Sequence, residues 1–333
     1  MTQLPGNKSP ASVKLPASSR GLATGLGFAS VILWGTSIAV NRLLVQELGL
    51  LQGPLISTAI SGTAGIVLLA LRRGEMAKLR RLPALFWAVC GGLFVAYTLS
   101  YNLGVGLARN GRQLLLFGIL NYLWPVLTVA FSAALFRRRI RPWFFAGIAA
   151  AIAAVVFAFL SRPATAGDAA ISLGKLTGDL RDNPVLYALG LFCGVAWALY
   201  SNLGRRIAGS TDANPVPLFF VAASAFFAVA WLAGAGTLMA GAGRPVAWDA
   251  GAVGVLAYRA LFVDLAAYTF WDAAMRRGSQ VLVAAASIFT PLLSTAAIAL
   301  MIRQKPGALF WVACAVAVIG AALCRYSVGD NDG

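Results

Sequence analysis

Apolar residues along the chain gather into ten long runs, and short segments rich in proline, glycine and charged residues separate them. An α-helix needs about 20 apolar residues to cross the hydrocarbon core of a bilayer, and the runs approach or exceed that length. The pattern therefore predicts ten transmembrane helices, at about 21–45, 54–72, 84–107, 113–136, 142–161, 184–207, 215–239, 250–273, 280–302 and 307–326.

The composition points to the same class of protein. Of the 333 residues, 59% are hydrophobic and only 11% are charged, and the mean hydropathy is +0.79. A water-soluble globule would lack enough polar residues for its surface at this composition. We therefore expect an all-α, multi-pass membrane protein, with nothing left over for a large soluble domain.

The net charge of +16 raises the question of nucleic acid, but the basic residues lie in short clusters beside the apolar runs. Cytoplasmic loops carry an excess of Lys and Arg, and most of these residues fall on alternate connections, such as 72–81, 137–141 and 276–277. This distribution predicts that both termini are cytoplasmic. The expected surroundings are a lipid bilayer, with no nucleic acid.

Polar segments divide the chain into two halves. Residues 1–20 are too long and irregular for a signal peptide and predict a cytoplasmic tail, and 327–333 predict a second one. The longest gap between apolar runs is 162–183, which mixes Pro, Gly, Asp, Lys and Arg. It is the expected linker between two five-helix repeats, at 21–161 and 184–326.

The two halves resemble each other in sequence. A shift of 163 residues places Trp34 on Trp197 and Arg42 on Arg205, and it also matches Gly27 with Gly190, Pro54 with Pro217 and Ser61 with Ser224. The fourth run of each half begins with Gly-x-Gln and reaches a proline, in GRQLLLFGILNYLWP (111–125) and GSQVLVAAASIFTP (278–291). Because five spans is an odd number, the second half must enter the membrane from the opposite side. Such inverted repeats recur in secondary transporters, which bind solute near the midplane between them.

These features resemble the drug/metabolite transporter superfamily of EamA type: two five-helix halves, a Trp in the first helix of each and a Pro in the fourth. Within that superfamily, residues 21–326 are most similar to the YddG-type aromatic amino acid exporters. Many EamA-type halves carry a Glu about thirteen residues after the fourth-helix proline, whereas this chain has Arg138 and Gln304 at those places. Any role of that glutamate does not carry over.

The resemblance implies a secondary transporter that exports amino acids, aromatic and other, across the bacterial inner membrane by alternating access. It also implies broad specificity. The alternative is a drug or other small-metabolite efflux carrier of the same superfamily. Coupling to protons and facilitated export down a gradient both remain open, since only one carboxylate, Asp264, lies deep in a span.

Candidate substrate-binding residues are the polar and aromatic side chains predicted at mid-depth. Tyr and Trp carry a polar atom that needs a partner when buried, so several at one depth favour a shared lumen, although each taken singly is compatible with packing. Tyr97 and Tyr101 are four residues apart and should share one helix face. The set is Trp34, Tyr97, Tyr101, Asn121, Trp124, Trp197, Tyr200, Asp264 and Tyr268.

Asp264 is the most informative single residue, because a carboxylate in mid-membrane needs water or a partner. It either pairs with Arg259, five residues earlier, or contacts a substrate amino group or a coupling proton. Asp272 lies one turn before Arg276, which predicts a salt bridge at the helix end. Arg42 and Arg205 are expected to anchor helix ends at the interfaces, with a gating role as the alternative.

Two prolines interrupt the backbone hydrogen bonds of the fourth run of each half. Pro125 and Pro291 are therefore candidate hinges for alternating access, and static kinks are the alternative. Asn121 and Ser287 occupy matching places just before them and are expected to hydrogen-bond a neighbouring helix or to face the lumen.

The sequence also argues against other classes of function. The chain has no histidine, no G-x-x-x-x-G-K-[ST] phosphate loop and no cysteine pair at metal-ligand spacing. We therefore expect no enzyme activity, no catalytic residues, no metal and no cofactor. A channel is a further alternative, and the oligomeric state stays open, with a monomer compatible with the sequence.

Overall fold

The structure is a computed structural model, and it describes residues 17–109, 113, 117–118, 120–135, 141–160, 181–209, 211–234, 248–301 and 308–327. Every regular element in these ranges is helical, with no strand among them. The predicted all-α class is therefore confirmed. Most of the two predicted tails and of the linker lies outside the described residues, as do Arg138, Gln304 and the side chain of Arg42.

The first half of the chain supplies nine of the described helices. They are α1 (Ala17–Gly35), α2 (Ser37–Leu48), α3 (Gln52–Leu71), the short α4 (Glu75–Arg80), α5 (Ala84–Phe86), η1 (Trp87–Gly91), α6 (Gly92–Leu107), α8 (Trp124–Leu135) and α9 (Trp143–Leu160).

The second half supplies the remaining helices. Its helices are α11 (Pro184–Ala208), α12 (Val216–Leu232), α14 (Ala250–Tyr258), η2 (Arg259–Ala266), α15 (Ala267–Arg277), α16 (Gln280–Ala286), η3 (Ser287–Phe289), α17 (Thr290–Met301) and α18 (Ala308–Ser327). In both halves the third span runs on without a break from α-helix through a π-helical turn, as α5–η1–α6 and as α14–η2–α15.

Among the described residues, four helices are long and apolar enough to cross a membrane, at Gln52–Leu71, Ala84–Leu107, Pro184–Ala208 and Ala250–Arg277. Helices α1 and α2 together form a fifth candidate that bends by 46°. Shorter apolar helices occur at Trp124–Leu135, Trp143–Ala154, Val216–Leu232, Gln280–Ser294 and Trp311–Cys324. The membrane class of the protein follows from these lengths and compositions.

Several of the predicted spans are interrupted. The bend between α1 and α2 falls at Thr36, whose hydroxyl donates to the carbonyl of Leu33 at 2.8 Å, a local bond that competes with regular helix geometry. Pro125 and Pro291 are each the second residue of a helix, α8 and α17, and each follows a break in the α-helical ladder. Proline is favoured at such a start because its missing N–H is not needed there.

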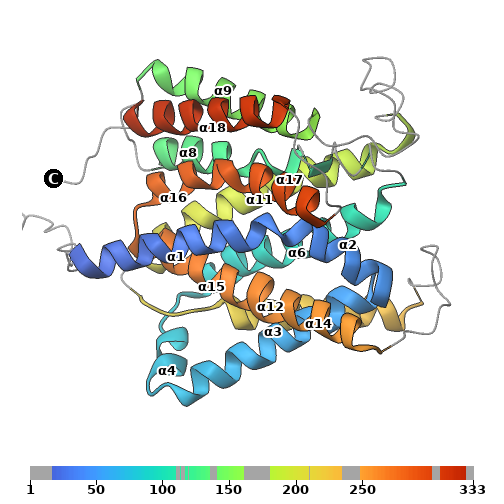
Figure 1. Ribbon diagram of the computed structural model, residues 1–333. Helices are drawn as coiled ribbons and strands as arrows, with labels where there is room; N and C mark the ends of the chain where they lie inside the picture. The colour runs from blue at the N-terminus through green and yellow to red at the C-terminus, as the bar shows by residue number, and fades with distance from the viewer. Residues whose placement is uncertain are drawn as a thin grey trace, which may run out of the picture.

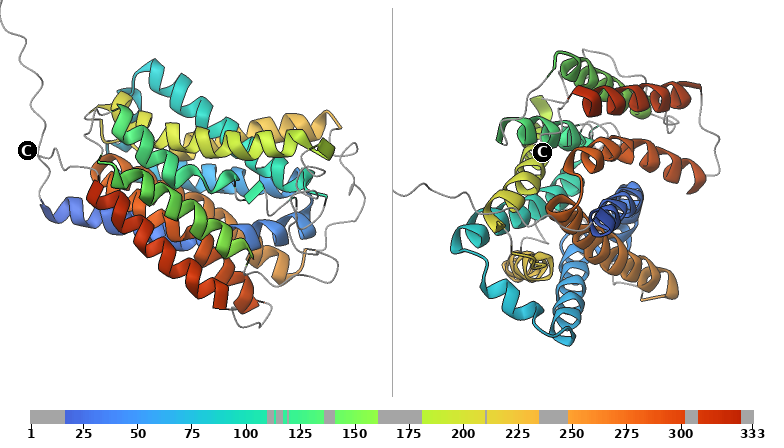
Figure 2. Two further views of the ribbon diagram at one scale, coloured as in Figure 1. Left: turned by 90° about the horizontal axis from the view of Figure 1, so that it is seen from above. Right: turned by 90° about the vertical axis from the view of Figure 1, so that its left-hand side faces the viewer.

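Helices from opposite halves pack against each other throughout the bundle. Helix α9 lies along α18 at one edge, and α3 lies along α12 (Figures 1 and 2). A β-carbon added at Gly147 in α9 would lie 2.7 Å from Sγ of Cys324 in α18, so this pair approaches at small-residue distance. The beginning of α1 and the end of α18 lie at the same end of the bundle (Figure 1).

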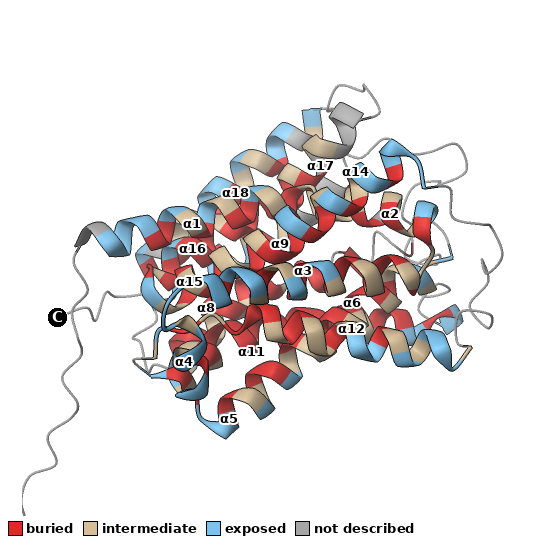
Figure 3. Cartoon of the chain, turned by 90° about the horizontal axis from the view of Figure 1, so that it is seen from below, coloured by how far each residue is buried: buried red, intermediate tan, exposed pale blue. Residues whose placement is uncertain are grey.

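Burial follows the expectation for a helical bundle in lipid. Large apolar side chains such as Trp143, Phe226 and Leu232 are exposed on the outer faces of their helices, while the inner faces are buried (Figure 3). The largest buried apolar cluster lies where α1, α6, α11 and α15 meet, and it is unusually rich in Trp, Tyr and Phe. This cluster surrounds the candidate site.

Candidate functional site

A cavity lies in the middle of the bundle, and residues from both halves of the chain form its wall. The cavity is small, with a volume of about 30 Å³. The lining residues are Trp34, Ser37, Tyr97, Tyr101, Asn121, Tyr122, Trp124, Trp197, Arg259, Val263, Tyr268 and Thr290. Of the residues predicted to bind substrate, only Tyr200 and Asp264 are missing from this lining.

The indole of Trp34 lies at the centre of the aromatic wall. It meets Trp124 and Trp197 edge to face, with ring centroids 5.9 Å and 5.4 Å apart, and Tyr268 at 4.9 Å. Edge-to-face contact is a favoured geometry for aromatic pairs. The two tryptophans that the repeat alignment matches, Trp34 and Trp197, thus touch each other directly.

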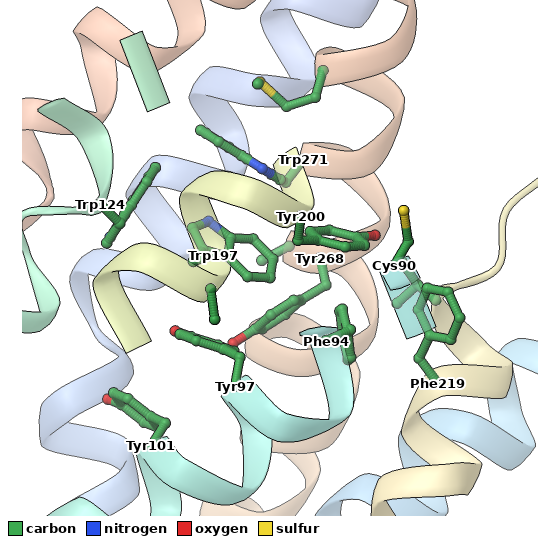
Figure 4. Close-up of a cluster of buried hydrophobic side chains, with 14 of the residues drawn as sticks. Cys90, Phe94, Tyr97, Tyr101, Trp124, Trp197, Tyr200, Phe219, Tyr268 and Trp271 are labelled. Carbon is green, nitrogen blue, oxygen red and sulfur yellow. The ribbon is translucent and has the colours of Figure 1, made fainter. Parts of the chain in front are cut away.

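A second side of the wall comes from α6 and α11. The rings of Tyr97 and Tyr101 stack with centroids 6.0 Å apart, as their spacing of four residues predicts, and Tyr97 also contacts Trp197 at 4.9 Å (Figure 4). All of these rings are less than a tenth exposed. A flat apolar solute group entering here would contact aromatic faces and edges on several sides.

Arg259 and Asp264 form an ion pair, which was one of the two alternatives for Asp264. Nε of Arg259 donates to Oδ1 of Asp264 at 2.9 Å, and the hydroxyl of Ser57 in α3 donates to Oδ2. A spacing of five residues would not align two side chains on an α-helix, but both belong to the π-helical turn η2, whose repeat is i to i+5. Arg259 lines the cavity and Asp264 lies behind it.

Tyr200 and Asp272 belong to a different network. The hydroxyl of Tyr200 donates to Oδ1 of Asp272 at 3.2 Å, and Asp272 forms an ion pair with Arg276, which donates in turn to the carbonyl of Ala213. The predicted helix-end salt bridge is therefore present. Figure 4 shows Tyr200 turned away from Tyr101 and toward the side of Cys90.

Trp271 closes one end of the aromatic cluster and was not among the predicted residues. It is fully buried, its centroid lies 5.0 Å from that of Trp124, and its Nε1 donates to Oγ of Ser201 at 3.0 Å. Its place three residues after Tyr268 on one helix face was the signal available in the sequence.

Thr290 was also missed, although the repeat contained a signal for it. It immediately precedes Pro291, just as Trp124 immediately precedes Pro125, and both line the cavity. Transferring the role of Trp124 to the position that it matches in the second half indicates Thr290. The repeat gave no such signal for Arg259, because the π-helical turn determines whether its side chain points into the cavity.

No family model matches the chain, but it is similar in sequence to known proteins. A protein of Ancylobacter novellus named aromatic amino acid exporter YddG is 31% identical over 315 residues, which cover 92% of this chain and 97% of the relative. Proteins of the same name from Salmonella typhimurium and Escherichia coli are each 25% identical, over 91% and 92% of this chain and 96% and 97% of their own lengths.

A solved structure extends the likeness to the fold. The crystal structure of another protein matches this chain with a TM-score of 0.70 and 27% sequence identity. The match covers 91% of this chain and 96% of that one.

Proposed function

The chain belongs to the family of YddG-type aromatic amino acid exporters, and on this premise we propose that it exports aromatic and other amino acids by alternating access, with broad specificity. It is a transporter and not an enzyme. The membrane that we assign to it is the bacterial inner membrane.

The observation that carries this proposal is the contact between Trp34 and Trp197 in the wall of a central cavity. The two residues come from the first long helix of each half, so a solute placed between them would contact both halves at once. An aromatic wall with scattered polar atoms suits an amphiphilic solute with a flat side chain. The substrate-binding residues that we propose are Trp34, Tyr97, Tyr101, Asn121, Trp124, Trp197 and Tyr268, with Asp264 and Tyr200 in supporting positions behind them.

The helix contacts support a ten-span arrangement of two inverted repeats. Helix α1 packs on α15 and α17, and its counterpart α11 packs on α6 and α8. If each helix is replaced by its counterpart in the other half, the pair α1–α15 becomes α11–α6, and the pair α1–α17 becomes α11–α8. The pairs α3–α12 and α9–α18 are unchanged by this exchange. A two-fold relation between residues 21–161 and 184–326 accounts for this set of contacts. We place both termini in the cytoplasm, where the clusters of Lys and Arg would lie.

Two glycines matched by the repeat support alternating access. A β-carbon on Gly27 would lie 2.7 Å from Val283, and one on Gly190 would lie 3.1 Å from Phe117. Each glycine thus allows a close contact between the two halves. Because the halves are inverted in the proposed arrangement, the two contacts lie toward opposite ends of the cavity. In the proposed cycle these contacts separate in turn, and the helix breaks at Pro125 and Pro291 act as hinges.

The deciding experiment is counterflow in liposomes that contain only the purified protein. Vesicles loaded with unlabelled phenylalanine should accumulate external labelled phenylalanine transiently, and a panel of unlabelled amino acids should compete in an order led by aromatic ones. Repeating the measurement with and without a pH gradient determines the coupling. Flux without trans-stimulation would indicate a channel, and no flux of any amino acid would overturn the proposal.

A further inference from the structure

The cavity wall contains buried polar atoms that have no hydrogen-bond partner among the described residues. They are Nη1 of Arg259, Nε1 of Trp34, Oδ1 of Asn121 and Oγ1 of Thr290. The four residues are between 2% and 7% exposed. A buried polar atom left without a partner costs about 1–3 kcal/mol, so a group of them in one cavity indicates a polar ligand.

Arg259 is held in a way that leaves part of its guanidinium for a ligand. Nε of Arg259 donates to one carboxylate oxygen of Asp264, and the hydroxyl of Ser57 donates to the other. These bonds orient the Arg259 side chain from the side away from the cavity. Nη1 remains unpaired on a residue that lines the cavity. A guanidinium with free N–H groups is the protein side chain best suited to bind a carboxylate.

Two of the other unpaired atoms are oxygens that can accept hydrogen bonds. Oδ1 of Asn121 comes from the fourth predicted span of the first half, and Oγ1 of Thr290 from the fourth predicted span of the second half, three positions further along in the repeat. A primary ammonium needs acceptors of this kind. The aromatic rings that surround them provide a place for an apolar side chain.

We propose that this cavity holds a headgroup site for an α-amino acid zwitterion, in which Arg259 binds the carboxylate and Asn121 and Thr290 accept hydrogen bonds from the ammonium. The inference rests on the proposed function and deepens it by assigning the recognition of the headgroup. Asp264 is then a positioning residue that acts through Arg259. Because the Arg259–Asp264 pair is neutral overall, a neutral zwitterion enters without adding net charge, whereas an amine or an organic acid adds one.

The test is a comparison of binding by ligands that differ only in the headgroup. The probes are L-phenylalanine, phenethylamine, which lacks the carboxylate, and 3-phenylpropionate, which lacks the amine. Their Kd values are measured on the full-length protein in detergent, by ligand-induced thermal stabilisation, so that the result does not depend on transport. We expect the unmodified protein to bind phenylalanine about 10- to 100-fold more tightly than either analogue, the range for a charged hydrogen bond.

Two variants remove the carboxylate site in different ways. Arg259→Lys keeps the charge but loses the planar fork, and the double variant Arg259→Gln with Asp264→Asn removes both charges without leaving either partner unpaired. In both, the advantage of phenylalanine over phenethylamine should fall below about threefold. Thr290→Val should instead lower the ratio of the Kd of 3-phenylpropionate to the Kd of phenylalanine. Arg206→Gln, on an exposed residue near the end of α11, is the matched control and should leave both ratios unchanged.

The outcomes separate the two proposals. If the unmodified protein transports phenylalanine and the double variant keeps the full preference for phenylalanine over phenethylamine, the headgroup site is wrong and the exporter function stands. If the unmodified protein transports no amino acid in liposomes, the function itself is wrong.

Discussion

Arg259 reaches Asp264 across one π-helical turn, with 2.9 Å between Nε and Oδ1, and the two side chains are 6% and 2% exposed. The pair is buried deep in a span, where an unpaired charge is costly. The stability of this part of the bundle therefore depends on the two charges neutralising each other.

Replacing Asp264 with Asn should destabilise the protein more than replacing both partners. The single change leaves the Arg259 guanidinium charged, buried and without a counter-charge, which costs about 3–5 kcal/mol in known cases. Adding Arg259→Gln should recover part of this loss in thermal unfolding in detergent. Glu75→Gln breaks the partly exposed Glu75–Lys78 pair and should cost less than about 1 kcal/mol. A double variant no more stable than Asp264→Asn would contradict this account.

Shortening the aromatic wall should change which amino acids the protein prefers. Tyr97→Ala, Tyr101→Ala and Trp124→Ala each remove a ring from the cavity lining, and we expect each to lower the flux of tryptophan relative to leucine by about threefold or more, since an aromatic contact contributes about 0.5–1.5 kcal/mol beyond burial. Competition in the counterflow assay measures the order. Trp143→Ala, on an exposed ring, is the control. An unchanged order in all three cavity variants would place the site elsewhere.

Tyr200→Phe should affect stability and leave binding almost unchanged. Tyr200 is not among the cavity-lining residues, and its hydroxyl donates to Asp272 at 3.2 Å. Loss of this bond should lower the free energy of unfolding by about 1–3 kcal/mol, because Asp272 is buried and charged. The Kd for phenylalanine should change by less than about twofold. A large rise in Kd with normal stability would assign Tyr200 to the binding site instead.

Two glycines that lie two residues apart in α1, and so on different faces of the helix, make a matched pair of variants. A β-carbon on Gly27 would lie 2.7 Å from Val283 and 2.9 Å from Ala274, whereas one on Gly25 would meet nothing within 4 Å. Gly27→Ala should therefore push α1 away from the second half, lower the unfolding temperature and slow counterflow several-fold, with overpacking costs of about 1–3 kcal/mol. Gly25→Ala should leave both unchanged. Equal behaviour of the two variants would show that close packing at Gly27 is not required.

The sequence was sufficient for the class of fold and for most of the cavity wall. Long apolar runs predict where spans lie, and the repeat alignment pairs Trp34 with Trp197, whose rings are in contact. The bend at Thr36 and the π-helical turn at Arg259 were not predicted, because both depend on how a helix is held by its neighbours. The sequence predicts Tyr200 at mid-depth, but depth alone does not say toward which neighbour a ring points, and the Tyr200 hydroxyl donates to Asp272.

The edge-to-face contact between Trp34 and Trp197 has a consequence for the electrical behaviour of the membrane. Proton conduction through a pore requires an unbroken chain of water molecules, and two indoles with centroids 5.4 Å apart, 7% and 2% exposed, leave no room for water where they meet. We expect the empty carrier to be tight to protons, so that a cell can keep it in the membrane without losing its membrane potential. Liposomes that enclose a pH-sensitive dye test this, because replacing both indoles with Ala should produce a leak that the unmodified protein does not show.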